Sequence, residues 1–104
     1  MFLVYVTCGS EKEAEKISEI LLKEGLAACA NIHESKSIYF WKGKFVKEKE
    51  HVLMLKTIEK KYEKLERRIR QLHSYGIPCI IAFKTEKAEK KYARWVEREA
   101  RSRK

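Results

Sequence analysis

The sequence predicts an α+β, ferredoxin-like fold: one antiparallel four-stranded sheet with two helices on one face. Two observations predict it. Segments with strand and helix patterns follow one another as strand, helix, strand, strand, helix, strand (βαββαβ), with a further helix at the C-terminus. No linker, repeat or low-complexity segment separates them, and 104 residues is the length of one domain, so we assign residues 1–104 to a single domain.

The first strand and helix have clear boundaries in the sequence. Phe2 to Cys8 is a short apolar run rich in valine and tyrosine, which is typical of a buried strand. Ser10 and Glu13 have the spacing of a capping box, in which each side chain satisfies a free backbone N–H of the other residue. Apolar residues at helical spacing then predict a helix over 11–24, ended by Gly25.

A long hairpin is predicted next. Residues 27–33 and 37–41 form one extended stretch, and residues 45–58 return as a second arm with alternating character. Lys42-Gly43 between them is a plausible tight turn, since glycine readily adopts positive φ.

Three elements complete the chain. Apolar residues that step by 3, 4 and 3 predict a helix over 59–73. Residues 77–83 form the last strand, which Pro78 suits at its start because proline cannot donate to a ladder. A terminal helix is predicted over 86–102. Because the two main helices cover one face of a sheet with long strands, we expect an oligomer to cover the other face.

The composition excludes several function classes. The chain has no aspartate, which excludes an aspartyl nucleophile and an aspartate-rich calcium or magnesium site. Its net charge of +9 is concentrated in residues 59–73 and 84–104, where basic residues alternate with glutamate. This pattern is typical of a solvated helical face and argues against a nucleic-acid partner. Abundant lysine and glutamate with one asparagine and one glutamine indicate a thermophilic source, with a basic mesophilic protein as the alternative.

The expected localisation rests on two features that the sequence lacks. No apolar run approaches the roughly 18 residues that span a bilayer, and the short apolar N-terminus has no basic region before it. We therefore expect a cytoplasmic protein without a membrane partner, whose three cysteines are reduced.

Three known functions of this fold do not match the sequence. A copper chaperone would carry C-x-x-C in the first loop, but Cys8 has no second cysteine after it. The aromatic pattern that stacks RNA bases is missing after Gly43. Acyl-phosphate hydrolysis needs an arginine beside the first loop, and the first arginine is Arg67.

The remaining candidates are thiols and imidazoles, which suit copper and zinc. None of the cysteines and histidines has the spacing of a ligand pair, and each cysteine is more readily a small buried hydrophobic residue. We interpret Cys8 and Cys79 in this way. They lie on strands that are neighbours in this fold, so their thiols could be close without binding a metal, and any further role of either stays open.

Motifs along the whole chain resemble those of the CutA family of divalent-ion tolerance proteins. Residues 27–32 read Ala-Ala-Cys-Ala-Asn-Ile, and residues 37–44 match the family's S-x-Y-x-W-x-G-K. Glu50 and residues 55–57 match its third strand, and Tyr92-x-x-Trp95 matches its terminal helix. Residues 73–78 match its H-P-Y-x-x-P except that Ser74 replaces the first proline.

The resemblance implies a homotrimer that is architecturally similar to PII signalling proteins, with the long hairpin paired to neighbouring subunits and high heat stability. It implies binding of copper or another divalent metal ion, with zinc as a possibility, in metal-ion tolerance. No agreed catalytic reaction is known for the family. The residues give no nucleophile arrangement either, since Cys29 lies in mid-strand with no evident activating cation, so we expect a protein that is not an enzyme.

The resemblance also implies site residues. Cys29 and His73 match the family's cysteine and histidine and are the candidate metal ligands. The residues that match those lining the cleft between subunits are Tyr39, Trp41, Lys56 and Tyr75. Aromatic residues are also enriched at interfaces, and Lys56 and Glu50 could pair across one, so simple interface packing is the alternative.

Three functions remain open from the sequence. The first is a divalent-cation (copper) binding trimer for metal-ion tolerance. The second is a PII-like trimeric signalling or adaptor protein that binds a small anion or nucleotide in the cleft between subunits. The third is a structural trimer with incidental metal affinity.

Overall fold

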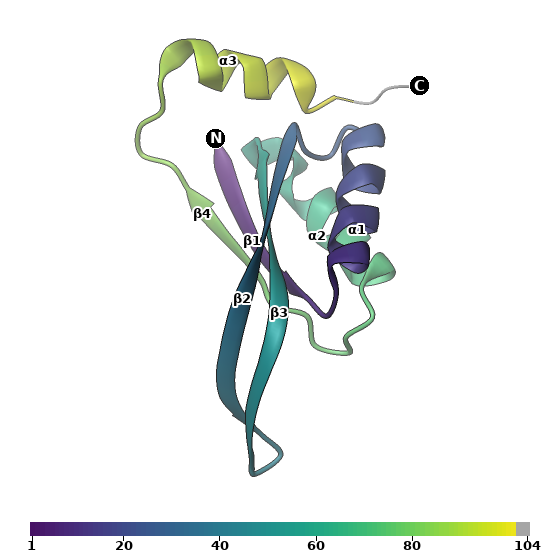
Figure 1. Cartoon of the computed structure of the whole chain (residues 1–104). Helices are drawn as coiled ribbons and strands as arrows, with labels where there is room; N and C mark the ends of the chain where they lie inside the picture. The colour runs from purple at the N-terminus through teal and green to yellow at the C-terminus, as the bar shows by residue number, and fades with distance from the viewer. Residues whose placement is uncertain (102–104) are drawn as a thin grey trace.

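The computed structural model describes residues 1–101 and has the predicted order of elements (Figure 1). The four strands are β1 (Phe2–Cys8), β2 (Cys29–Trp41), β3 (Lys44–Thr57) and β4 (Ile80–Lys84). The helices are α1 (Glu11–Lys23), α2 (Tyr62–Leu72) and α3 (Lys90–Glu99), with a 3₁₀ turn, η1 (Glu59–Lys61), before α2.

The strands form one antiparallel sheet in the order β2-β3-β1-β4. Helices α1 and α2 pack side by side on one face of it (Figure 1). Alternate residues of β1 and β3, such as Val4, Val6, Leu53 and Leu55, point into the core between sheet and helices and are fully buried. The predicted ferredoxin-like fold is therefore confirmed.

Helix α1 begins and ends as the sequence predicts, with one difference in the capping box. The Ser10 hydroxyl accepts a hydrogen bond from the Glu13 backbone N–H at 3.1 Å. The Glu13 carboxylate, however, binds the N–H groups of Gly9 and Ser74. The box is half formed because the loop after α2 offers Glu13 a second donor. At the other end Gly25 adopts φ 75°.

The β2–β3 hairpin is confirmed, with a first arm that begins two residues later than predicted and runs without the predicted interruption. Strand β2 is continuous through Ser35 and Lys36, which pair with residues of β3, and it begins at Cys29. The turn residues Lys42 and Gly43 have φ of 50° and 79°, which is the geometry of a type I′ turn. The far half of the hairpin projects beyond the helices (Figure 1).

The last two elements are shorter than predicted. Strand β4 begins at Ile80, because residues 77–79 precede the ladder with β1, which starts at Ile80 opposite Val6. Helix α3 begins after Glu89, whose side chain caps it by accepting from the Tyr92 N–H at 2.9 Å. It was expected over 86–102, and position 102 lies outside the described residues.

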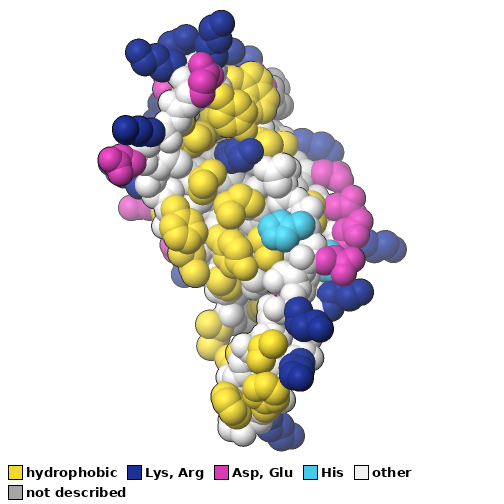
Figure 2. Space-filling view, turned by 60° about the vertical axis from the view of Figure 1, so that its left-hand side comes forward, with side chains coloured by type: hydrophobic (Ala, Val, Ile, Leu, Met, Phe, Trp, Pro, Cys, Tyr) yellow, Lys and Arg dark blue, Asp and Glu magenta, His cyan; other side chains and the backbone are white. Residues whose placement is uncertain are grey.

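The sheet face opposite α1 and α2 is largely open. Helix α3 lies near only one end of the sheet (Figure 1), and Ile81 and Phe83 are 48% and 52% exposed. Hydrophobic side chains gather along the molecule on the side shown in Figure 2. Within residues 1–101, no helix has the length and hydropathy to cross a bilayer.

Candidate functional site

A thiol, a carboxylate and an imidazole meet where β1, α1 and α2 come together. Cys8 ends β1, Glu13 lies in the first turn of α1, and His73 caps the C-terminus of α2. One ligand atom from each residue lies within 4.8 Å of the other two. We call these three residues the Cys–Glu–His cluster.

The His73 ring is fixed on both sides by the backbone. Its Nδ1 accepts a hydrogen bond from the Tyr75 N–H at 3.1 Å, and its Nε2 lies 2.8 Å from the Thr7 carbonyl oxygen. Because a carbonyl can only accept, Nε2 carries the proton and the ring is a neutral imidazole. Nδ1 also lies 3.9 Å from the Glu13 carboxylate, so it faces the centre of the cluster.

Glu13 is held as a carboxylate. Burial alone would raise its pKa, but hydrogen bonds from Ser74 and Gly9 outweigh burial and hold the pKa below its ordinary value. The two oxygens accept at 2.8 Å from Ser74 and 3.2 Å from Gly9.

Cys8 is fully buried. Burial, reinforced by the charges of Glu13 and Glu50, raises the pKa of its thiol to about 12. A bound metal cation would reverse this effect, because coordination deprotonates a thiol. Thiolate, imidazole and carboxylate together suit zinc or copper, and a cation at Nδ1 would replace the Tyr75 N–H there.

Cys29 does not join His73 within one chain. It begins β2 opposite Lys56 of β3, and Lys56 in turn pairs with Leu3 of β1. His73 binds the carbonyl of Thr7, four residues further along the same strand and at its other end. A metal ion held by Cys29 and His73 would require a second copy of the chain, and that ligand pair stays a prediction.

Cys29 also has a cation that the sequence did not reveal. Lys56 faces it across the ladder, and its Nζ lies 5.3 Å from the Tyr92 ring centroid. A hydrogen bond with Tyr92, with smaller contributions from Cys29 and Tyr92 charge, raises the pKa of Lys56. The expectation that Cys29 lacks a neighbouring cation was wrong, because cross-strand register is not visible in the sequence.

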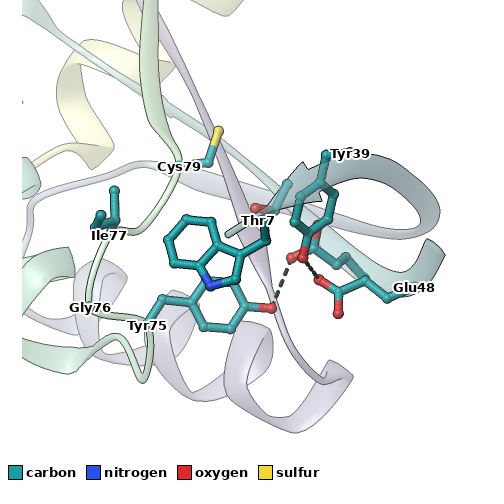
Figure 3. Close-up of a pocket in the computed structure, with 9 residues that line it drawn as sticks. Thr7, Tyr39, Glu48, Tyr75, Gly76, Ile77 and Cys79 are labelled. Atoms are coloured by element: carbon teal, nitrogen blue, oxygen red, sulfur yellow. Dashed lines mark hydrogen bonds between the residues drawn. The ribbon is translucent and has the colours of Figure 1, made fainter. Parts of the chain in front are cut away.

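Three of the four predicted cleft residues line one cavity of about 460 Å³ (Figure 3). Tyr39 and Trp41 come from β2 and Tyr75 from the loop after α2. Lys56 is not among the residues that line it. We call this space the aromatic cavity.

Two glutamates on β3 give the aromatic cavity its polarity. The Tyr39 hydroxyl donates to Glu48 at 2.5 Å and the Tyr75 hydroxyl donates to Glu50 at 2.8 Å, as the dashed lines in Figure 3 mark. The hydrogen bond to Glu48 raises the pKa of Tyr39 to about 12, and burial together with Glu50 raises the pKa of Tyr75. Cys79 also lines the cavity, whereas Cys8 packs in the core.

Sequence reasoning missed part of both sites. Cys8 was interpreted as a small buried hydrophobic residue and Glu13 only as a capping residue, although the Glu13 carboxylate reaches Ser74. Glu48 was not singled out, although it lies two residues from Glu50 and so shares its face of a strand. This two-residue spacing from Glu50 was the signal in the sequence that could have identified Glu48.

Comparison with known proteins identifies the family. The family model described as "CutA1 divalent ion tolerance protein" matches residues 2–99. A divalent-cation tolerance protein CutA of Pyrococcus horikoshii is 41% identical over 96 residues, covering 92% of this chain and 94% of that protein.

Solved structures share the fold. The crystal structure of CutA1 from Pyrococcus horikoshii superposes with a TM-score of 0.93 at 38% identity, covering 100% of both chains. The PII-like protein CutA from Nostoc sp. PCC 7120 gives a TM-score of 0.90 at 29% identity, covering 96% of this chain and 97% of that one.

Proposed function

Because the chain belongs to the CutA1 family of divalent ion tolerance proteins, we propose that it binds a soft or borderline divalent cation, copper or zinc, in metal-ion tolerance, and that it catalyses no reaction. The observation that carries this proposal is the convergence of Cys8, Glu13 and His73 from three separate elements. With no aspartate in the chain, thiolate and imidazole are the distinctive ligands available.

The proposal includes a homotrimer in the cytoplasm. The open apolar sheet face supports assembly, and a PII-like relative has the same fold. Three free cysteines suit a reducing compartment. The lysine- and glutamate-rich composition suits a heat-stable assembly.

Titration with Zn²⁺ and Co²⁺ under reducing conditions tests the metal site. Co²⁺ is the probe because a thiolate ligand gives a charge-transfer absorption band. Cys8→Ser should abolish this band and weaken Zn²⁺ binding at least tenfold, and His73→Gln should weaken binding similarly. Cys29→Ser, a matched thiol change at the far end of the sheet, should bind as wild type does.

The outcomes separate two assignments. Equal loss in Cys29→Ser and His73→Gln, with Cys8→Ser unaffected, would move the site to the ligand pair predicted from the sequence. Unchanged affinity in all three variants would refute metal binding by these residues. Circular dichroism of each variant shows whether it is folded.

A second function is supported by a separate observation. The aromatic cavity brings together Tyr39, Trp41 and Tyr75, and its volume lies in the range of small-molecule sites. We therefore propose PII-like binding of a small molecule in this cavity, which would lie at the cleft between subunits in the proposed trimer. A thermal-shift screen with a chelator present tests it, because ligands of the folded state raise the melting temperature.

A further inference from the structure

The electrostatics of the aromatic cavity indicate which class of small molecule it takes. Glu50 is only 6% exposed and accepts one hydrogen bond, from Tyr75. Among residues 1–101, none of the side-chain ion pairs involves Glu48 or Glu50. A carboxylate buried to this extent without a cation is costly, and a cationic partner would offset that cost.

The neighbouring lysines on β3 do not supply this cation. Lys47 and Lys49 alternate with Glu48 and Glu50 and so point to the other face of the strand. Lys49 pairs with Glu34 at 3.5 Å, and the Nζ of Lys47 lies 5.9 Å from the Phe45 ring centroid. In the described part of the chain, no lysine, arginine or histidine lines the cavity.

The remaining walls are suited to an organic cation. Each carboxylate binds a tyrosine hydroxyl through one oxygen and retains further acceptor capacity. Tyr39 and Trp41 are 37% and 50% exposed, so their rings are accessible to a ligand. Carboxylates beside aromatic rings form the arrangement that holds ammonium ions through ion pairing and cation–π contact.

We infer that the aromatic cavity binds a small organic cation bearing an ammonium group, paired with Glu48 and Glu50 and packed against Tyr39, Trp41 and Tyr75. This inference rests on the small-molecule function proposed above and names its ligand class. It differs from the anion or nucleotide expected from the sequence, which would need Lys56 at the site, and within one chain Lys56 does not line the cavity. Negative charge on the walls would repel either of those ligands.

Calorimetric titration of the full-length protein, as it assembles in solution, tests the inference in amine-free phosphate buffer with a chelator. The probes are choline, putrescine and 3,3-dimethyl-1-butanol, which has the shape of choline without its charge. Choline or putrescine should bind at least tenfold more tightly than the neutral alcohol. Glu50→Gln and Glu48→Gln should each weaken binding at least tenfold.

Glu34→Gln is the matched control, because Glu34 lies on the same hairpin outside the cavity. It should bind as wild type does. If Glu50→Gln fails to fold, Glu48→Gln alone decides the role of charge, since Glu48 is less buried than Glu50. Equal binding of the neutral alcohol, or an unchanged affinity in both variants, would overturn the inference.

Other outcomes distinguish competing occupants. Binding of a nucleotide in place of the amines overturns the cationic assignment and leaves the small-molecule function standing. Binding of Ca²⁺ or Mg²⁺ without chelator, lost in Glu50→Gln while the amines fail to bind, makes this a metal site. No binding of any probe overturns the inference.

Discussion

At the scale of single residues, the surroundings of the Cys–Glu–His cluster fix the protonation state of each of its three side chains. His73 is neutral because the backbone supplies both a donor and an acceptor to its ring. Glu13 is charged because two backbone N–H groups point at it. Cys8 is protonated because burial raises its pKa. The cluster therefore stabilises the fold even without a metal, by joining the start of α1 to the loop after α2.

Glu13→Gln should destabilise the protein by about 2 kcal/mol at pH 7, because the amide group can accept at only one of its two atoms. The folded-state pKa of Glu13 lies below the ordinary value of 4.5. The charged form therefore stabilises the fold above that value, and this stabilisation is lost as pH falls through the folded-state pKa. Denaturant unfolding at pH 7 and pH 3 should show the difference between wild type and variant shrinking.

The control for this pH dependence is Glu15→Gln, an exposed change on the same helix. Glu15→Gln should change the free energy of unfolding little at both pH 7 and pH 3. Cys8 and His73 face Glu13 in both wild type and variant. A constant difference between pH 7 and pH 3 would contradict the assigned charge of Glu13.

His73 was predicted as a site residue and lies in a site, but its partners could not be predicted. Cys8 and Glu13 are separated from His73 by about sixty residues, and no ligand spacing links them. What brings them together is the packing of α1 and α2 on one sheet face. The resemblance identified individual positions, and the positions that surround them depend on that packing.

At the scale of elements, the positions of turns and of one helix end could be predicted from the sequence. The Lys42-Gly43 turn and the Gly25 stop were both predicted, because positive φ is a local property with few residue solutions. The predicted starts of helices and strands were wrong where a residue or strand elsewhere in the chain determines them. Strand β4 begins where β1 can pair with it, and α3 begins where Glu89, an unusual cap residue, reaches the Tyr92 N–H.

The hairpin turn yields a stability prediction. Lys42 is a side-chain-bearing residue at φ 50°, and asparagine tolerates this conformation better in a type I′ turn. Lys42→Asn should stabilise the protein by about 0.5 kcal/mol, whereas Gly43→Ala should destabilise it by about 1 kcal/mol. Guanidinium unfolding at one fixed protein concentration measures both. The two substitutions should change the free energy of unfolding in opposite directions, and a stabilising Gly43→Ala would contradict the turn geometry.

At the scale of the whole molecule, the open sheet face dominates. The alternation that fills the core with Val4 and Leu55 leaves Ile81 and Phe83 on the other face, exposed to water. The sequence predicted that this face would lack cover, because the predicted helices are too few to cover both faces of the sheet. It did not predict that α3 lies near only one end of the sheet.

Placing charge on this face should prevent assembly. Ile81→Lys with Phe83→Lys should convert the proposed trimer to a monomer, because two buried cations cannot be paired there. Analytical ultracentrifugation measures the mass, against 12.4 kDa for one chain. Lys64→Glu, a charge change on α2, should leave assembly intact. A wild type that sediments as a monomer would refute the trimer itself.

The projecting hairpin also affects how the protein reaches its final state. Beyond the helices, residues such as Ile38 and Phe40 are 57% and 72% exposed, so the far half of β2 and β3 gains little from burial within one chain. The core between the sheet and helices α1 and α2 can collapse within one chain in a first-order step. The apolar side chains of the projecting half of the hairpin find partners only by collision between chains. Refolding should therefore end in a phase whose rate rises with protein concentration.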